Sequence, residues 1–254
     1  MEKGSVIGLP LAFAMVLGGM VLEGGHLSSI VGLAAAVIVF GGALGATMLD
    51  VPFEGMVLAF KRVKDIFTGG HHDHHALVDE ISRLAATARK DGLLALEKER
   101  DSITNPLLKE GVKFAVDGLE PNLVQQILES RIDFRQHQAE MAAKFWTQFG
   151  AYSPTVGILG AVLGLIHVME NLDNPAAIGP GIATAFIATV YGVAASNLVF
   201  MPMGNKMKAV VAHDGLYFEM IRMGVKSIQL GTSPTIIASQ LLAIVDENPK
   251  EDAA

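Results

Sequence analysis

Four long stretches of this chain contain no Asp, Glu, Lys or Arg, and this feature constrains the fold more than any other. A helix needs about 20 residues to cross the roughly 30 Å hydrocarbon core of a bilayer. The uncharged stretches run approximately over Ser5–Leu22, Leu27–Leu49, Ala151–Met169 and Gly181–Gly204. One such stretch could be a buried helix of a soluble protein, but four of them in 254 residues, of which 18% are charged, favour a membrane protein. We therefore predict an all-α polytopic membrane protein with four transmembrane helices and a helical cytoplasmic domain.

The distribution of positive charge predicts the orientation of these spans. Only Lys3 precedes the first span, whereas residues 50–150 hold thirteen of the nineteen Lys and Arg residues and residues 205–254 hold five. The short connectors around Glu23–His26 and Glu170–Pro180 hold none. Because Lys and Arg gather in cytoplasmic loops, we expect both termini and the large loop to be cytoplasmic. The first stretch is too long for a signal-peptide core, and no small-x-small cleavage signal follows it, so we interpret it as a retained span.

The alternation of apolar and polar segments divides the chain into four parts. They are the first two transmembrane helices (1–50), a cytoplasmic helical domain (51–150), the third and fourth transmembrane helices (151–204) and cytoplasmic C-terminal helices (205–254). Helical spacing of apolar residues predicts that Met56–Phe67 continues the second span and that Ala76–Glu99 is one amphipathic helix. A long helix is expected to start at Pro121 and to run into the third span.

Small residues recur three or four positions apart in the spans, which is typical of helices that pack closely in lipid. The candidates are Gly157, Gly160 and Gly164 in the third span, Gly192 in the fourth, and Gly41 and Gly45 in the second. These faces could simply hold the four spans together, or the third and fourth spans could line a narrow space filled by another helix. The sequence leaves both interpretations open. Pro154 and Pro202 lie at the cytoplasmic ends of the third and fourth spans, where they could bend a helix or simply mark its boundary.

Several classes of function lack their required residues. With no cysteine, the chain has neither disulfides nor thiolate metal sites, and its net charge of −7 gives no reason to expect nucleic-acid binding. The histidine run His71–His75 invites a metal-transporter interpretation, but the spans offer only His167 as a metal-binding side chain, so no metal site or cofactor is predicted. No phosphate loop, zinc-protease motif or paired intramembrane acids are present, so we do not expect an enzyme. A purely structural scaffold stays open.

At two places the sequence resembles the MotA family, the ion-channel subunits of bacterial flagellar stators. The segment "YSPTVGILGAVLGLIHVMENLDNPAAIGPGIATAFIATVYGVAASNLVFMPMGNKM" (152–207) resembles the family's signature region, and "ARKDGLLALE" (88–97) is similar to its charged motif. The layout of two spans, a large loop and two further spans matches along nearly the whole chain. The wider group includes TolQ and ExbB, which resemble a three-span layout with the opposite N-terminal side. A TolQ-like or ExbB-like subunit of another energy-transducing complex is therefore the alternative.

The resemblance implies a mechanism and a set of partners. Several copies would form a homo-oligomeric ring in the bacterial inner membrane, expected to be a pentamer, around a dimer of MotB-type subunits. Each MotB-type subunit has a single span with an essential aspartate and a domain that binds peptidoglycan. Protonation or sodium binding at that aspartate would let the ring step around its partner and push the rotor switch protein of the flagellum. Since this chain has no carboxylate in its spans, the ion-carrying group must come from the partner, and we interpret His167 as an interfacial or structural residue.

The resemblance also implies roles for individual residues. Pro154 and Pro202 match two prolines thought to couple ion passage to movement. Arg89 and Glu97 match charges that engage the rotor; eight residues apart in one helix, they would share a face.

Two further residues bear on the ion path. Thr189 matches a threonine that lines it. Ala161 lies where sodium-type relatives tend to carry a threonine whose oxygen helps to replace the hydration shell of sodium. An alanine offers no such oxygen, so protons are favoured over sodium as the transported ion.

Overall fold

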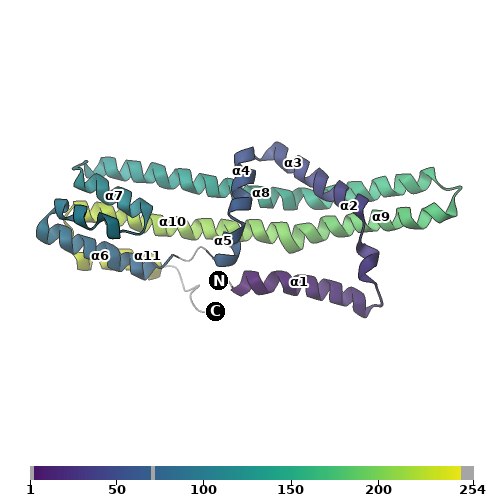
Figure 1. Ribbon diagram of the computed structural model, residues 1–254, viewed down its shortest axis with the longest axis horizontal. Helices are drawn as coiled ribbons and strands as arrows, with labels where there is room; N and C mark the ends of the chain where they lie inside the picture. The colour runs from purple at the N-terminus through teal and green to yellow at the C-terminus, as the bar shows by residue number, and fades with distance from the viewer. Residues whose placement is uncertain (1–2, 70–71, 247–254) are drawn as a thin grey trace. The chain divides into compact units, whose positions relative to one another are not determined.

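The computed structural model describes residues 3–69 and 72–246, and within these ranges every regular element is helical (Figure 1). In chain order the elements are α1 (Lys3–Leu22), η1 (Leu27–Ile30), α2 (Leu33–Ala36), η2 (Val37–Gly41), α3 (Gly42–Asp50), α4 (Phe53–Lys61), α5 (Val63–Thr68), α6 (His74–Asp91), η3 (Leu93–Lys98), η4 (Arg100–Ser102), α7 (Pro106–Val116), α8 (Pro121–Glu170), α9 (Pro175–Ala194), η5 (Ala195–Phe200), α10 (Met201–Gln229) and α11 (Pro234–Asp246). The segments η2 and η5 are π-helical, and the other three η segments are 3₁₀ turns. The prediction of an all-α fold is confirmed.

Four helical stretches of the described chain are long and apolar enough to cross a membrane. They are Lys3–Leu22, Leu33–Asp50, a part of Pro121–Glu170 and a part of Ile178–Gln229, which confirms the number of predicted spans. The second stretch begins at Leu33 rather than Leu27, because extended backbone at Val31 and Gly32 separates η1 from α2.

The fourth helix begins earlier than its predicted start at Gly181. Helix α9 starts at Pro175, where the Asn174 side chain accepts a hydrogen bond from the Ala176 amide and proline occupies the first turn. Proline is well suited to this position, because the first turn of a helix needs no hydrogen bond from the N–H that proline lacks.

The chain packs as two compact units. The first contains the described residues up to Gly69 together with Gln138–Val210, and the second contains the described residues from His72 to His137 together with those from Val211 onward. The boundaries of these units differ from those of the four predicted segments, because α4 and α5 pack with the membrane spans.

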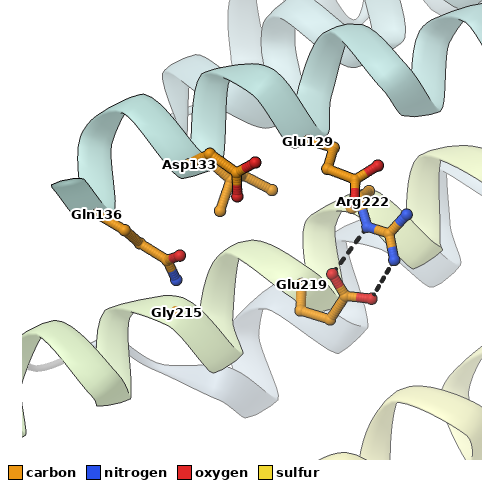
Figure 2. A pocket seen from close by; sticks show the side chains of 7 residues that line it. Glu129, Asp133, Gln136, Gly215, Glu219 and Arg222 are labelled. Carbon is orange, nitrogen blue, oxygen red and sulfur yellow. Dashed lines mark hydrogen bonds and ion pairs between the residues drawn. The ribbon is translucent and has the colours of Figure 1, made fainter.

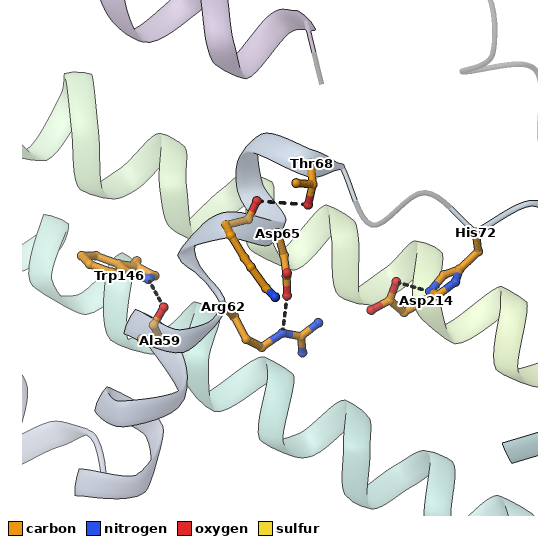
Figure 3. A network of polar contacts seen from close by, with 8 residues as sticks. Ala59, Arg62, Asp65, Thr68, His72, Trp146 and Asp214 are labelled. Carbon is orange, nitrogen blue, oxygen red and sulfur yellow. Dashed lines mark hydrogen bonds and ion pairs between the residues drawn. The ribbon is translucent and has the colours of Figure 1, made fainter. Parts of the chain in front are cut away.

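The core of the first unit gathers aromatic rings from α8 around small residues of α3 and α4. Phe149 stacks on Phe200 with ring centroids 4.1 Å apart, and Phe145 is fully buried beside them. The Trp146 indole N–H donates to the Ala59 carbonyl at 3.4 Å, which ties α8 to α4 (Figure 3).

The segment Met56–Phe67 does not continue the second span, so that prediction is wrong. Helix α3 ends at Asp50, Val51 is extended at φ −120° and ψ 130°, and α4 restarts at Phe53. Pro52 is the physical reason, because proline disfavours the helical region for the residue before it and has no N–H to donate into the preceding turn.

The second unit has a core of aliphatic side chains from five helices. The residues buried to 2% exposure or less include Leu77, Ile81 and Leu84 of α6, Leu107 and Leu108 of α7, Leu128 of α8, Met220 and Ile221 of α10, and Ile237 of α11. Asp73 caps α6 by accepting from the Ala76 amide at 2.9 Å. Helix α6 ends at Asp91 because Gly92 takes φ +84°, so the prediction of a single helix over Ala76–Glu99 is wrong.

Candidate functional site

Helices α8 and α9 meet backbone to backbone at the glycines that the sequence singles out. A Cβ atom built on Gly192 would lie 2.5 Å from the Ser153 carbonyl oxygen and 3.0 Å from the Gly157 Cα. A Cβ on Gly164 would lie 3.1 Å from the Ala185 Cα. Small residues thus bring the two backbones into direct contact, and we call this set of approaches the α8–α9 contact.

Gly160 contributes to the same contact more loosely, and the second span uses a different glycine from the two predicted. A Cβ on Gly160 would lie 2.9 Å from the Ala188 Cβ, a side-chain atom. No described atom outside their own helix and chain neighbours lies within 4 Å of a Cβ built on Gly41 or Gly45, so their predicted packing role is wrong within one copy of the chain. The close approach is made instead by Gly42, whose Cβ would lie 2.8 Å from Val156 Cγ1.

Two polar side chains of the fourth span, Thr189 in α9 and Asn197 in η5, bond back to the helical turn that precedes them. The Thr189 hydroxyl donates to the Ala185 carbonyl at 3.3 Å, and the Asn197 amide donates to the Val193 carbonyl at 3.0 Å. A threonine that donates its proton to the backbone keeps its oxygen free to accept a hydrogen bond or to contact a cation. Thr189 is half-buried, and so is Ala161, which offers no polar side-chain atom at all.

Both candidate coupling prolines lie inside helical structure at points where the backbone pattern is interrupted. Pro154 lies within α8, half-buried, and cannot donate to the carbonyl of Gly150. Its neighbour Ser153 is fully buried and donates to the Phe149 carbonyl at 2.6 Å. Pro202 is exposed and is the second residue of α10, the helix that directly follows the π-helical segment η5. Such π segments are frequent at functional sites.

His167 lies near the end of α8 and is exposed. The Asn171 side-chain amide donates to the His167 carbonyl at 2.8 Å, so this part of α8 joins the turn that leads to α9. Within the described stretches 151–169 and 181–204, no carboxylate accompanies this imidazole.

Tyr191 has a role that the sequence did not reveal. Its hydroxyl donates to the Ile30 carbonyl at 2.7 Å and accepts from the Gly32 amide at 3.1 Å, and its ring stacks on Phe40 at 5.9 Å. It therefore satisfies the extended backbone just before α2. A tyrosine within an apolar helix was a usable signal, since a buried phenol usually finds a polar partner.

The two candidate rotor-contact charges do not share a helix face, so that part of the prediction is wrong. Arg89 lies near the end of α6, whereas Glu97 lies beyond the Gly92 break in η3. Both are exposed, and Glu97 pairs with Arg100 at 2.8 Å. Glu99 fixes η3 to α6 through an ion pair with Arg83 and a hydrogen bond from Thr87.

Two histidines of the run, His72 and His74, pack against α10 as aromatic groups. His72 Nε2 lies 3.1 Å from Asp214 Oδ1 (Figure 3), and the His72 ring stacks on Tyr217 at 4.1 Å. His74 meets His213 edge to face at 4.8 Å, while His71 lies outside the described residues. Among the residues that the structure describes, no three His, Cys, Asp or Glu side chains are placed to hold a metal ion.

Tyr217 lies beyond the spans, in the second unit. Burial raises its pKa, a hydrogen bond with Asn105 lowers it, and the charges of Glu80 and Asp73 raise it further.

A polar cleft of about 220 Å³ opens between α8 and α10 in the second unit (Figure 2). Its lining residues are Glu129, Ile132, Asp133, Gln136, Gly215, Glu219 and Arg222. The Arg222 guanidinium holds Glu219 with two hydrogen bonds of 2.8 and 2.6 Å, and this pairing raises the pKa of Arg222. This ion pair lies within α10, and the bonds to α8 run from the Arg222 guanidinium to the Gln125 side-chain oxygen at 3.3 Å and from the Gln125 amide to the Arg222 carbonyl at 3.0 Å.

Comparisons with known proteins agree along the whole chain. The model of the MotA/TolQ/ExbB proton channel family matches residues 99–220, and that of the motility protein A N-terminal region matches residues 6–92. Motility protein A of Bacillus subtilis is 32% identical over 95% of this chain and 90% of its own length. Chemotaxis protein PomA of Vibrio alginolyticus is 30% identical over 98% of each.

Two solved structures have the same fold. The C. jejuni MotAB structure superposes with a TM-score of 0.90 at 30% identity, covering 99% of this chain and 97% of its counterpart. The flagellar MotAB stator complex from Bacillus subtilis gives 0.83 at 30% identity, over 98% of this chain and all of its counterpart. With both regions matched and a relative covered over 90% of its length, this chain belongs to the motility protein A branch of the MotA/TolQ/ExbB proton channel family.

Proposed function

We propose that this chain is the ion-channel subunit of a flagellar stator, and that it works with a MotB-type partner to convert ion flow into torque on the rotor. The observation that carries the proposal is the full-length similarity to two solved MotAB stators, with a TM-score of 0.90 over 99% of the chain for one of them. The match of residues 6–92 to the motility protein A N-terminal region favours this role over that of a TolQ-like or ExbB-like subunit.

In this proposal the chain forms the wall of the ion path and the partner supplies the ion carrier. The described parts of the third and fourth spans hold no carboxylate, whereas Thr189 keeps an oxygen available beside the path. A carboxylate on a partner helix would take up the ion, because a charge at mid-membrane is costly and is kept only for a function. No catalytic chemistry is required of this chain.

Protons are the proposed ion. Replacing the hydration shell of sodium takes several oxygen ligands, and the methyl group of Ala161 supplies none. A proton needs only the partner's carboxylate and one acceptor or water, for which the Thr189 oxygen suffices.

The proposed orientation places both termini and the large loop in the cytoplasm. Copies of the chain would ring a MotB-type dimer, and the exposed Arg89 and Glu97 would engage the rotor switch protein. The supporting observations are the excess of Lys and Arg in the loop and the exposure of both side chains.

Ion flux in proteoliposomes tests the proposal. The chain alone is compared with the chain plus a MotB-type partner truncated to keep the path open, under a proton gradient and, separately, a sodium gradient. We expect flux only with the partner and only down the proton gradient. Flux from the chain alone would contradict a partner-borne carrier, and the first residue to replace would then be His167.

The two prolines allow a test of coupling. Pro154→Ala and Pro202→Ala restore an amide donor inside a helix, so they should leave assembly intact while abolishing rotation. Assembly is measured by co-purification with the partner and rotation by tethered-cell assays. Loss of assembly in both variants would assign the prolines a purely structural role.

A further inference from the structure

The segment α4–α5 (Phe53–Thr68) begins where a membrane-spanning helix ends. The second span closes at Asp50, and α4 starts three residues later at Phe53. Pro52 breaks the helix between them, so the chain leaves the line of the span within a few residues of its end. This segment is therefore held close to the bilayer surface by its connection to the span.

One side of α4 is buried and the other exposes two large aromatic rings. Gly55 and Ala59 face the core, whereas Phe53 is 64% exposed and Phe60 is 56% exposed. The two phenylalanines are seven residues apart, about two helical turns, and so lie on one side of the helix. Phe60 is also fixed in place, with its ring centroid 5.2 Å from that of Trp146.

Such a pair of rings suits the membrane interface. In water, exposed phenylalanines are unfavourable, whereas an amphipathic helix with aromatic residues on one side and lysines beside them lies stably at the level of the lipid headgroups. Lys61 directly follows Phe60, Lys64 lies at the start of α5, and both are exposed.

Most carboxylates near Phe53–Thr68 are paired with a basic side chain, so Lys61 and Lys64 give this surface a net positive charge. Asp65 pairs with Arg62 at 2.9 Å, and Asp50 pairs with Lys144 at 3.1 Å. Across the described ranges, no carboxylate pairs with Lys61 or Lys64. Glu54 is exposed as well, but it lies at the opposite end of α4, in the first turn.

We infer that Phe53–Thr68 binds anionic phospholipid headgroups of the leaflet on the side of the large loop, with Phe53 and Phe60 at the interface and Lys61 and Lys64 against the headgroup phosphates. The inference rests on the proposed membrane orientation. Lysines held at an anionic membrane surface each strengthen binding about fivefold, so loss of both should weaken it roughly 25-fold. The preference should also decrease as salt screens the charges.

The chain contains its own probe for this site. Trp146 is its one tryptophan, and it packs directly against Phe60. Bromine atoms on lipid acyl chains quench indole emission at short range. The full chain is therefore reconstituted into phosphatidylcholine vesicles that contain phosphatidylglycerol, with the bromines carried either by phosphatidylglycerol or by phosphatidylcholine. The ratio of the two quenching constants gives the selectivity for the anionic lipid beside Phe60.

We expect stronger quenching by brominated phosphatidylglycerol at equal mole fraction, and a loss of this preference in the Lys61→Gln/Lys64→Gln double variant. The matched control is Lys90→Gln/Lys98→Gln, which removes two exposed lysines from the second unit and should leave the ratio unchanged. Equal quenching by the two lipids in the wild type, or an unchanged ratio in the Lys61/Lys64 variant, would overturn the inference.

Ion flux in parallel vesicles that also contain the partner separates this inference from the stator function. Partner-dependent flux without lipid selectivity would refute the lipid site alone. Lipid selectivity without flux would refute the proposed function and leave the lipid site standing.

Discussion

Replacing Gly192 with alanine is the most direct test of the α8–α9 contact. The new Cβ would lie 2.5 Å from the Ser153 carbonyl oxygen, 3.0 Å from the Gly157 Cα and 3.2 Å from the Pro154 Cα. All three are backbone atoms of α8, so no side chain can rotate away to make room. Ordinary contact begins near 3.4 Å, so the helices must separate by about 0.9 Å.

Two effects of opposite sign decide the magnitude. Overpacking against rigid neighbours costs up to about 3 kcal/mol, and a gap of 0.5–1 Å forfeits roughly a quarter to a half of the dispersion energy of each separated pair. Replacing a helical glycine with alanine stabilises the helix by about 1 kcal/mol, because alanine has the higher helix propensity. The net loss should be about 2 kcal/mol, which lowers the Tm of a chain of this size by roughly 4–8 °C.

The assay is thermal unfolding of the purified chain in detergent, followed by the emission of Trp146, which is buried in the first unit. Gly179→Ala is the matched control in the same helix, because no described neighbour lies within 4 Å of its Cβ, and its Tm should stay or rise. Gly160→Ala should lower the Tm less, and Ala188→Gly should rescue it, because the clash is with the Ala188 methyl. A Gly192→Ala chain that melts within about 1 °C of the wild type would refute the rigid contact.

Three further outcomes follow from contacts in the two units. Tyr191→Phe leaves the Ile30 carbonyl and the Gly32 amide without their partner, so the chain should lose about 1–3 kcal/mol and the Gly32 amide should exchange faster with deuterium; unchanged exchange would contradict this bridge. Because the pKa of Tyr217 is raised, its stabilising contribution is present below the ordinary tyrosine value of about 10 and is lost as the pH rises through the folded value. Tyr217→Phe should therefore remove an ionisation phase above the ordinary tyrosine value from the absorbance titration at 295 nm, and an unchanged titration there would contradict the raised pKa. Glu99→Gln should speed amide hydrogen exchange across η3. It should lower the folding stability by less than about 1 kcal/mol, because the partner Arg83 is half exposed. Exchange as slow as in the wild type would show that the burial of Leu96 is enough to hold η3 in place.

The sequence predicts the architecture wherever local chemistry and periodicity agree. Uncharged length alone predicts the four spans, and Pro121 marks the start of α8 as predicted. It fails where periodicity continues through a break. Apolar spacing carries on past Gly92 because Leu96 is buried in the same core as α6, and nothing in the spacing shows that the backbone turns at the glycine.

The candidate site was predictable as a set of residue types but not as a geometry. Spacing identifies Gly157 and Gly192 because small residues on one face indicate close packing. It could not show that Gly42 rather than Gly41 approaches α8, since the choice depends on the rotation of α3 against its neighbour. The contact of Tyr191 with residues 30–32 spans about 160 positions, beyond the reach of any local pattern.

The α8–α9 contact has a consequence for the energy supply of the cell. Where Gly157, Gly164 and Gly192 place one backbone against another, no water-sized gap remains for a file of solvent between these two helices. A copy of the chain alone therefore offers no leak along this line between α8 and α9. In the proposed stator the partner helix completes the ion path elsewhere, so conduction would depend on the finished assembly.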